Sequence, residues 1–138
     1  MRVFWFICVL AAALYAVPLF DDKNCKAIVF EDERADYSMG YECFYPKLTL
    51  IETYKRFKSD RMDEYSGYAV FEELRADLEV GKNYMDARED QNGVITIQYD
   101  WENDKTLGVY ADYESGDMSV RFAQTGGGTR MEVIFVSD

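Results

Sequence analysis

The sequence predicts an α+β fold in which a C-terminal four-stranded antiparallel meander packs against one or two helices. Four segments in the last third of the chain alternate apolar and polar residues, as strands of such a sheet do. Two earlier segments have apolar residues at helical spacing, and two cysteines mark a short N-terminal β segment. Because the helical segments precede the strands, we expect the helices to cover one face of the sheet.

The chain begins with a segment typical of a secretory signal peptide. Arg2 supplies a positive charge, residues 3–15 form a continuous apolar run, and Ala16 is a small residue suited to a cleavage site. An apolar run of this length is too short to span a bilayer comfortably. We therefore predict a signal peptide over residues 1–16 and a single secreted domain over residues 17–138.

The cysteines agree with export from the cell. Cys8 lies inside the predicted signal peptide, which leaves Cys25 and Cys43 as a pair. An even number of cysteines in a secreted protein favours a disulfide. We predict a Cys25–Cys43 disulfide that ties a strand at residues 26–30 to a second one at residues 40–45. The entropy of loop closure gives such a bond a stabilising effect of about 3 kcal/mol.

Two segments have the apolar spacing of a helix. The first covers residues 47–59, with Pro46 near its first position, and a strand over residues 48–54 is the alternative because β-branched residues lower helix propensity. The second begins at Tyr68 and ends before Gly81, with an apolar stripe opposite a charged face.

Four strands are predicted after these helices. Apolar residues alternate with polar ones over residues 94–101, 106–113, 118–122 and 130–136. The connections are short enough for hairpins, and the triple glycine at residues 126–128 suits a flexible hairpin tip. Strands joined in this way form an antiparallel meander.

The net charge of −11 limits the classes of partner. Binding to nucleic acid or to an anionic membrane depends on clustered Lys and Arg, so we expect neither. An acidic surface instead attracts cationic proteins, and aromatic residues supply large contact areas there. We predict Tyr110, Trp101 and Tyr113 as binding residues.

The chain lacks residues on which much catalysis depends. It contains no histidine, so it has no Ser–His or Cys–His arrangement and lacks the commonest metal ligand. With Cys25 and Cys43 in a disulfide, we expect no thiol nucleophile, and no phosphate-binding glycine motif is present. We therefore predict no catalytic residues, no cofactor and no enzyme activity.

Acidic residues near the predicted hairpins raise the question of calcium. Residues 90–95 match the middle of an EF-hand loop, but Arg88 and Tyr99 occupy the positions of two essential acidic ligands. We therefore predict no metal ligands. The alternative is that several acids crowd together at one end of the sheet, where a hard cation would bind them. These acids are Asp86, Glu89, Asp90, Asp112, Glu114 and Asp117.

These observations favour a secreted, non-enzymatic protein that binds an extracellular protein partner through an acidic, tyrosine-bearing surface. One alternative is a carrier of a small apolar ligand, held between sheet and helix by Trp101, Phe71 and Leu74. Another is a glycan hydrolase that uses carboxylates such as Asp100 and Glu102, which flank Trp101.

Overall fold

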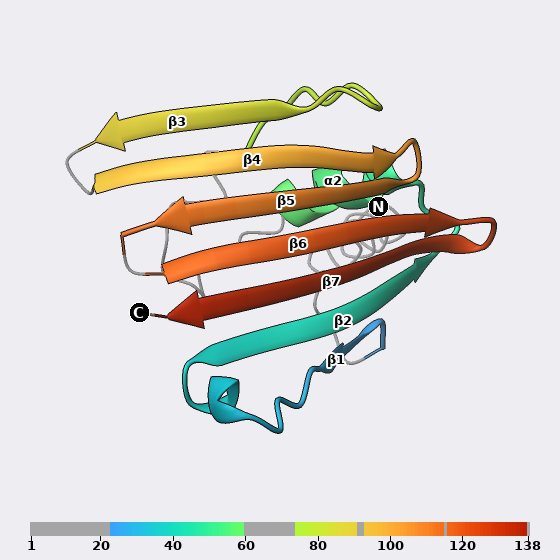
Figure 1. Cartoon of the computed structure of the whole chain (residues 1–138). Coiled ribbons are helices and arrows are strands. Elements are labelled where there is room, and N and C mark those ends of the chain that lie inside the picture. The colour runs from blue at the N-terminus through green and yellow to red at the C-terminus, as the bar shows by residue number, and fades with distance from the viewer. Residues whose placement is uncertain (1–22, 60–73, 91–92, 115, 138) are drawn as a thin grey trace, which may run out of the picture.

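A computed structural model describes residues 23–59, 74–90, 93–114 and 116–137. In this part of the chain, strands form one antiparallel sheet in the order β1-β2-β7-β6-β5-β4-β3 (Figure 1). The strands are β1 (Cys25–Ala27), β2 (Ser38–Pro46), β3 (Tyr84–Asp90), β4 (Gly93–Asn103), β5 (Thr106–Tyr113), β6 (Gly116–Thr125) and β7 (Gly128–Ser137). A 3₁₀-helix, η1 (Glu33–Asp36), precedes β2, and an α-helix, α2 (Leu50–Ser59), follows it.

The sheet is larger than the sequence predicted. A sheet-rich α+β domain with one helix is confirmed in the described residues, but the four-stranded meander is wrong because the sheet has seven strands. β3 extends it on one side, and β2 and β1 extend it on the other. β2 pairs with β7 along its whole length, from Ser38 opposite Val136 to Pro46 opposite Gly128. The N-terminal β segment is therefore continuous with the main sheet.

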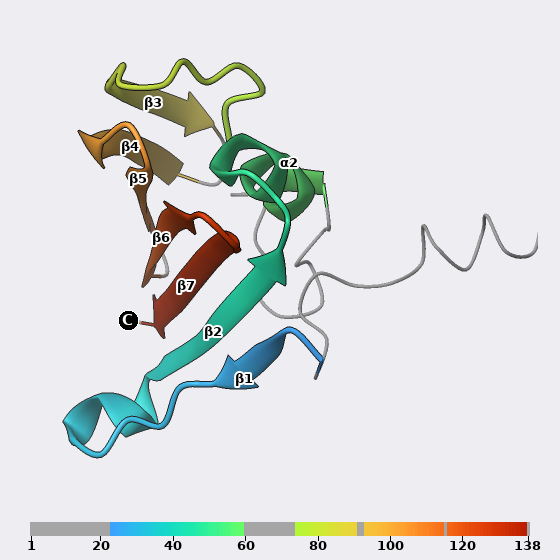
Figure 2. The same ribbon diagram turned by 90° about the vertical axis from the view of Figure 1, so that its right-hand side faces the viewer.

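The helix α2 covers one face of the sheet, which we call the inner face (Figure 2). A capping box sets its start: the hydroxyl of Thr49 accepts the N–H of Glu52 at 3.2 Å, and the Glu52 carboxylate accepts the N–H of Thr49 at 3.0 Å. Tyr54 and Phe57 of α2 each make an edge contact with the ring of Phe122 on β6, with centroids 5.9 Å apart. These rings fix the helix on the sheet.

The predicted helix over residues 47–59 is confirmed, but it begins at Leu50. Pro46 ends β2 instead of opening the helix, and Lys47 has a positive φ of 67°, so the chain turns before the helix begins. The alternative, a strand over residues 48–54, is wrong, because α2 occupies most of this segment.

The predicted second helix is wrong where the structure describes it. Residues 74–83 form bends and turns, and residues 68–73 lie outside the described part. The backbone N–H and C=O of Arg75 bond to the hydroxyls of Tyr99 and Tyr54, so these groups are not available for a helical ladder. The predicted signal peptide, residues 1–16, also lies outside the described residues.

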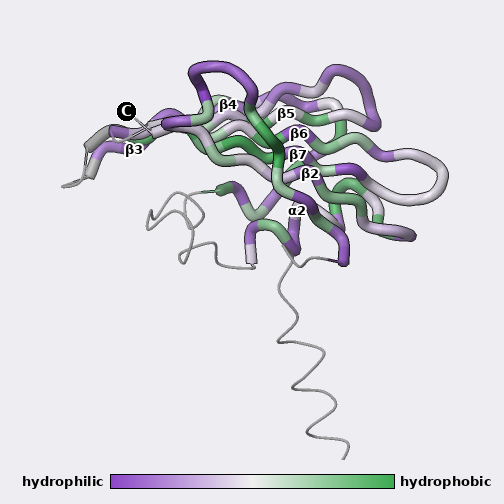
Figure 3. The backbone as a smooth tube through the Cα atoms, turned by 90° about the horizontal axis from the view of Figure 1, so that it is seen from below, coloured by the Kyte–Doolittle hydropathy of each residue, from purple (hydrophilic) through white to green (hydrophobic). Residues whose placement is uncertain are grey.

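The core fills the space between α2 and the inner face. Alternate residues of the three central strands point toward it and are buried, as the sequence pattern predicted. They include Leu107, Val109 and Ala111 of β5, Met118, Val120 and Phe122 of β6, and Met131, Val133 and Phe135 of β7. The other face of the sheet, which we call the outer face, lies away from α2 (Figure 3).

Candidate functional site

The outer face carries more acidic than basic side chains. On strands β1, β2 and β4 to β7, its acidic residues are Glu42, Asp100, Glu102, Asp112, Asp117 and Glu132, and its basic residues are Lys26, Arg121 and Arg130. Lys26 and Arg130 approach Glu42 at 3.9 and 3.7 Å, and Arg121 approaches Glu102 at 3.2 Å. Exposed ion pairs of this kind contribute little to stability. Since the bases are engaged and fewer, the outer face remains net negative.

Two pairs of like charges face each other directly on this face. Asp112 of β5 lies opposite Asp117 of β6, and Glu42 of β2 lies opposite Glu132 of β7. Like charges at opposed positions destabilise a sheet. The fold therefore tolerates a concentrated negative charge on its uncovered side.

Two aromatic rings interrupt the charged surface. Phe44 of β2 is 41% exposed and Tyr110 of β5 is 45% exposed. The ring of Tyr110 folds back along its own strand and lies over Gly108. A Cβ atom added at Gly108 would lie only 2.6 Å from the Tyr110 hydroxyl oxygen. Gly108 itself lies opposite Arg121 of β6. The missing side chain thus leaves room for a phenol ring to lie along the sheet.

The three predicted binding residues do not share a surface. Tyr110 lies on the outer face, whereas Tyr113 is 8% exposed on the inner face and Trp101 packs half-buried against the core. The indole Nε1 of Trp101 is buried and makes no hydrogen bond among the described residues. Asp100 and Glu102 alternate with Trp101 along β4, so their side chains point to the opposite face.

Sequence reasoning missed Phe44 as an exposed ring. Its exposure follows from the strand period: Cys43 faces inward to reach Cys25, so the next side chain must point outward. The contact between Gly108 and Tyr110 could not be read from the pattern, because it depends on how one side chain folds back along its own strand.

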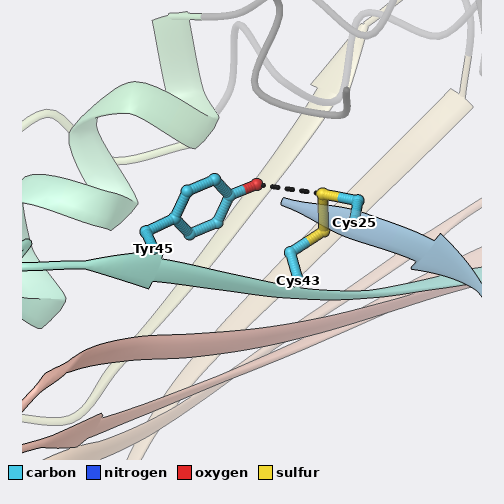
Figure 4. Close-up of a disulfide and its surroundings, with 3 residues drawn as sticks. All are labelled: Cys25, Cys43 and Tyr45. Atoms are coloured by element: carbon cyan, nitrogen blue, oxygen red, sulfur yellow. Dashed lines mark hydrogen bonds between the residues drawn. A yellow bond between two sulfur atoms is a disulfide. The ribbon is translucent and has the colours of Figure 1, made fainter. Parts of the chain in front are cut away.

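The predicted disulfide is confirmed. Cys25 and Cys43 lie opposite each other on β1 and β2, with Cα atoms 4.1 Å apart. The neighbouring N–H of Phe44 donates to the carbonyl of Asn24, so the cysteines form a pair without mutual backbone bonds, the arrangement that brings side chains closest. The hydroxyl of Tyr45 lies 3.3 Å from Cys25 Sγ (Figure 4). The bond fastens the short β1 to β2.

A second polar cluster centres on Arg75, beside a groove of about 540 Å³ at β3 and β4. The Arg75 guanidinium donates to the Asp86 carboxylate at 2.7 Å and lies 3.8 Å from the ring centroid of Tyr84. The Arg75 backbone is held from both sides by Tyr54 at 2.6 Å and Tyr99 at 2.8 Å. Burial raises the pKa of both tyrosines, so their hydroxyls stay protonated and act as structural hydrogen-bonding groups.

The alternative of acids crowded together at one end of the sheet is not found among the described residues. Among the described residues, no three Cys, Asp or Glu side chains are placed to bind a metal ion. β4 separates β3 from β5, and Asp86 pairs with Arg75 on the inner side, whereas Asp112 and Asp117 lie on the outer face. The side chain of Asp90 lies outside the described part.

No protein-family model matches this chain, and comparison with curated proteins and with solved structures found no match. In the ranges that the structure describes, no helix is long and apolar enough to cross a membrane.

Proposed function

We propose that this chain is a secreted, non-enzymatic binding protein whose outer sheet face docks a cationic extracellular protein. One observation carries this proposal: the outer face combines an excess of acidic side chains with the exposed rings of Phe44 and Tyr110, on the side of the sheet away from α2. Aromatic anchors among polar groups are typical of protein interfaces.

Phe44 and Tyr110 are close enough for one protein partner to contact both rings. β7 and β6 lie between the strands that carry Phe44 and Tyr110. Three strand spacings combined with the offset along the strands place the Cα atoms of Phe44 and Tyr110 roughly 20 Å apart. A standard interface buries about 800 Å² on each partner, which is enough to cover both rings and the acids between them.

The opposed acids favour a cationic partner. A Lys or Arg placed between Asp112 and Asp117 would relieve the repulsion between these opposed carboxylates. Such charges raise the rate of association and select against acidic partners.

Two features support secretion. The Cys25–Cys43 disulfide is typical of oxidising compartments and rare in the cytosol. Residues 1–16 have the charge and apolar run of a signal peptide.

The alternatives have less support from the geometry. Tyr54, Phe57 and Phe122 occupy the space between α2 and the sheet, where an apolar ligand was expected to lie. Trp101 and its flanking acids point to opposite faces, so they do not form a sugar-binding platform with paired carboxylates.

An NMR titration tests the proposal with a defined probe, a synthetic Lys/Arg-rich peptide that also contains aromatic residues. We expect amide shifts on β2, β5, β6 and β7 and weaker binding by Asp112→Lys, which removes an acid from the outer face without leaving a like-charge pair. Glu79→Lys is the matched control, because Glu79 is exposed in the segment before β3 and the change in net charge is the same. Equal weakening by both variants, or shifts spread over the whole molecule, would contradict a specific surface.

A further inference from the structure

The two edges of the sheet differ in length. β1 has 3 residues and is fastened by the disulfide, whereas β3 has 7 residues and pairs with β4 without irregularity. In the described part of the chain, no further strand pairs with the open side of β3. Natural proteins usually blunt such edges, because an open row of backbone groups can pair with another chain. β3 contains no proline and no bulge, but Asp86 and Arg88 are inward-pointing charges that oppose pairing with a strand unless that strand places opposite charges beside them.

The alternation of hydrogen bonds identifies which backbone groups of β3 face the open edge. The N–H of Trp101 donates to the side chain of Asn83, which precedes β3, so the odd-numbered residues of β4 point toward β3. Groups of successive residues in an antiparallel strand point to opposite sides. Met85, Ala87 and Glu89 therefore direct their N–H and C=O groups away from the sheet, while their even-numbered neighbours bond to β4.

We propose that a second copy of this chain pairs with this edge, antiparallel to β3 and related by a two-fold axis at Ala87. In this register, Ala87 lies opposite the second copy's Ala87, and Asp86 lies opposite the second copy's Arg88. The two-fold axis repeats this pair with the roles exchanged, so two ion pairs form. Each ion pair sits at a position without mutual backbone bonds, where side chains approach most closely.

The charged residues of β3 favour this pairing register over the two adjacent registers. A shift in one direction places Asp86 opposite the second copy's Asp86, and a shift in the other places Arg88 opposite the second copy's Arg88. Like charges at opposed positions are destabilising, whereas opposite charges are favourable. The edge is therefore complementary to itself in one alignment.

Among the described residues, the inner side of β3 borders an open groove. Arg75 contacts one carboxylate oxygen of Asp86, Oδ1, at 2.7 Å, and the groove beside β3 is lined by both Asp86 and Arg88. Arg88 is exposed. Asp86 would thus lie between Arg75 of its own chain and Arg88 of the second copy, which places two positive groups around one carboxylate.

Sedimentation velocity over a range of protein concentrations tests this dimer. We expect the wild-type chain to shift from monomer to dimer mass as the concentration rises. Ala87→Pro should stay monomeric, because proline removes the central N–H of the open edge while edge positions tolerate it. Ala27→Pro is the matched control on the other edge, where the N–H also faces outward, and it should still dimerise. A wild-type chain that is monomeric throughout, or an Ala87→Pro variant that dimerises normally, would overturn the proposal.

A charge-swap experiment tests the register and does not depend on proline. Arg88→Asp and Asp86→Arg should each abolish self-association, because each places like charges opposite one another twice. A mixture of the two variants should form a heterodimer in which both ion pairs are restored with new partners. Thermal unfolding of each variant verifies that it is folded, and the absence of a heterodimer from two folded variants would rule out this alignment.

The dimer is independent of the outer-face proposal. Ala87→Pro should leave peptide binding to the outer face unchanged, and Asp112→Lys should leave dimerisation unchanged, so failure of one proposal is distinguishable from failure of the other.

Discussion

Tyr54 of α2 donates its hydroxyl proton to the backbone carbonyl of Arg75 at 2.6 Å. The hydroxyl of Tyr99, on β4, accepts the backbone N–H of the same residue at 2.8 Å. Both tyrosine side chains are almost fully buried, so the segment that leads into β3 is held by a buried pair of hydroxyls. This arrangement connects the helix, the sheet and the segment between them through one peptide backbone.

Replacing Tyr54 with Phe should lower the free energy of unfolding by about 1–3 kcal/mol, because the Arg75 carbonyl loses its donor in a buried site. Urea denaturation measures this change. Tyr84→Phe is the matched control: its ring contacts Arg75 mainly through the π face, which Phe retains, so its effect should be under about 0.5 kcal/mol. Equal effects of the two variants would show that the Tyr54 hydrogen bond does not stabilise the fold.

The stability of the protein should fall steeply in alkaline solution. Burial raises the pKa of Tyr54 and Tyr99 in the folded state, whereas in the unfolded chain both titrate near about pH 10. Below that pH both states hold the protons, and the contribution to stability is complete. Above it the unfolded state releases protons that the folded state keeps, so the free energy of unfolding falls as the pH rises.

Urea denaturation at a series of pH values above neutrality measures this dependence. The Tyr54→Phe variant should show a shallower decline than the wild type, because it has lost one of the two titrating groups. A decline of the same slope in both proteins would assign the alkaline effect to other residues.

Removal of the disulfide should destabilise the fold by about 3 kcal/mol, by the entropy of loop closure. Cys25→Ser combined with Cys43→Ser makes the change without a reducing agent, and thermal unfolding measures it. Amide hydrogen exchange should rise most in β1, because this strand has 3 residues and one neighbour in the sheet. Exchange that rises equally in β5 would indicate global loosening instead.

The two ends of the triple glycine should differ in how much an alanine substitution destabilises the fold. Gly128 begins β7 with a φ of 153°, and a Cβ there would collide with the carbonyl of Tyr45 and lie 2.9 Å from the Cα of Pro46. Gly128→Ala should therefore cost about 2 kcal/mol or more. A Cβ added at Gly126 would meet no other atom within 4 Å, so Gly126→Ala should stay within about 0.5 kcal/mol of wild type. Similar melting temperatures for the two variants would contradict this assignment.

Local sequence pattern predicted the strands whose faces differ in polarity. β5 alternates buried residues such as Val109 with exposed ones such as Tyr110, and the structure follows that period. β3 escaped prediction because Asp86 and Arg88 occupy its inner side, where the sheet ends and water reaches the side chains. An edge strand with charges on both faces has no clear period.

Contacts between distant segments determine the features that the local sequence pattern did not predict. The pairing of β2 with β7 joins distant parts of the chain, so no local signal marks it. The apolar spacing before Gly81 indicated a helix, but Tyr54 and Tyr99 bind the backbone of Arg75 instead. For the candidate site, alternation places Tyr110 outward and places Trp101 and Tyr113 on the apolar faces of their strands, as the structure does, so the three residues do not form one surface.

The position of β7 has a consequence for how this protein reaches its native state. β3 to β6 are joined in sequence and can associate as each one is made, but β2 must wait for β7, which follows all the other described strands. Rates of folding fall when contacts join distant segments. A ribosome or translocation channel that still holds the last strand would therefore keep the β1–β2 pair apart from the rest of the sheet, and the polypeptide would complete its architecture after release.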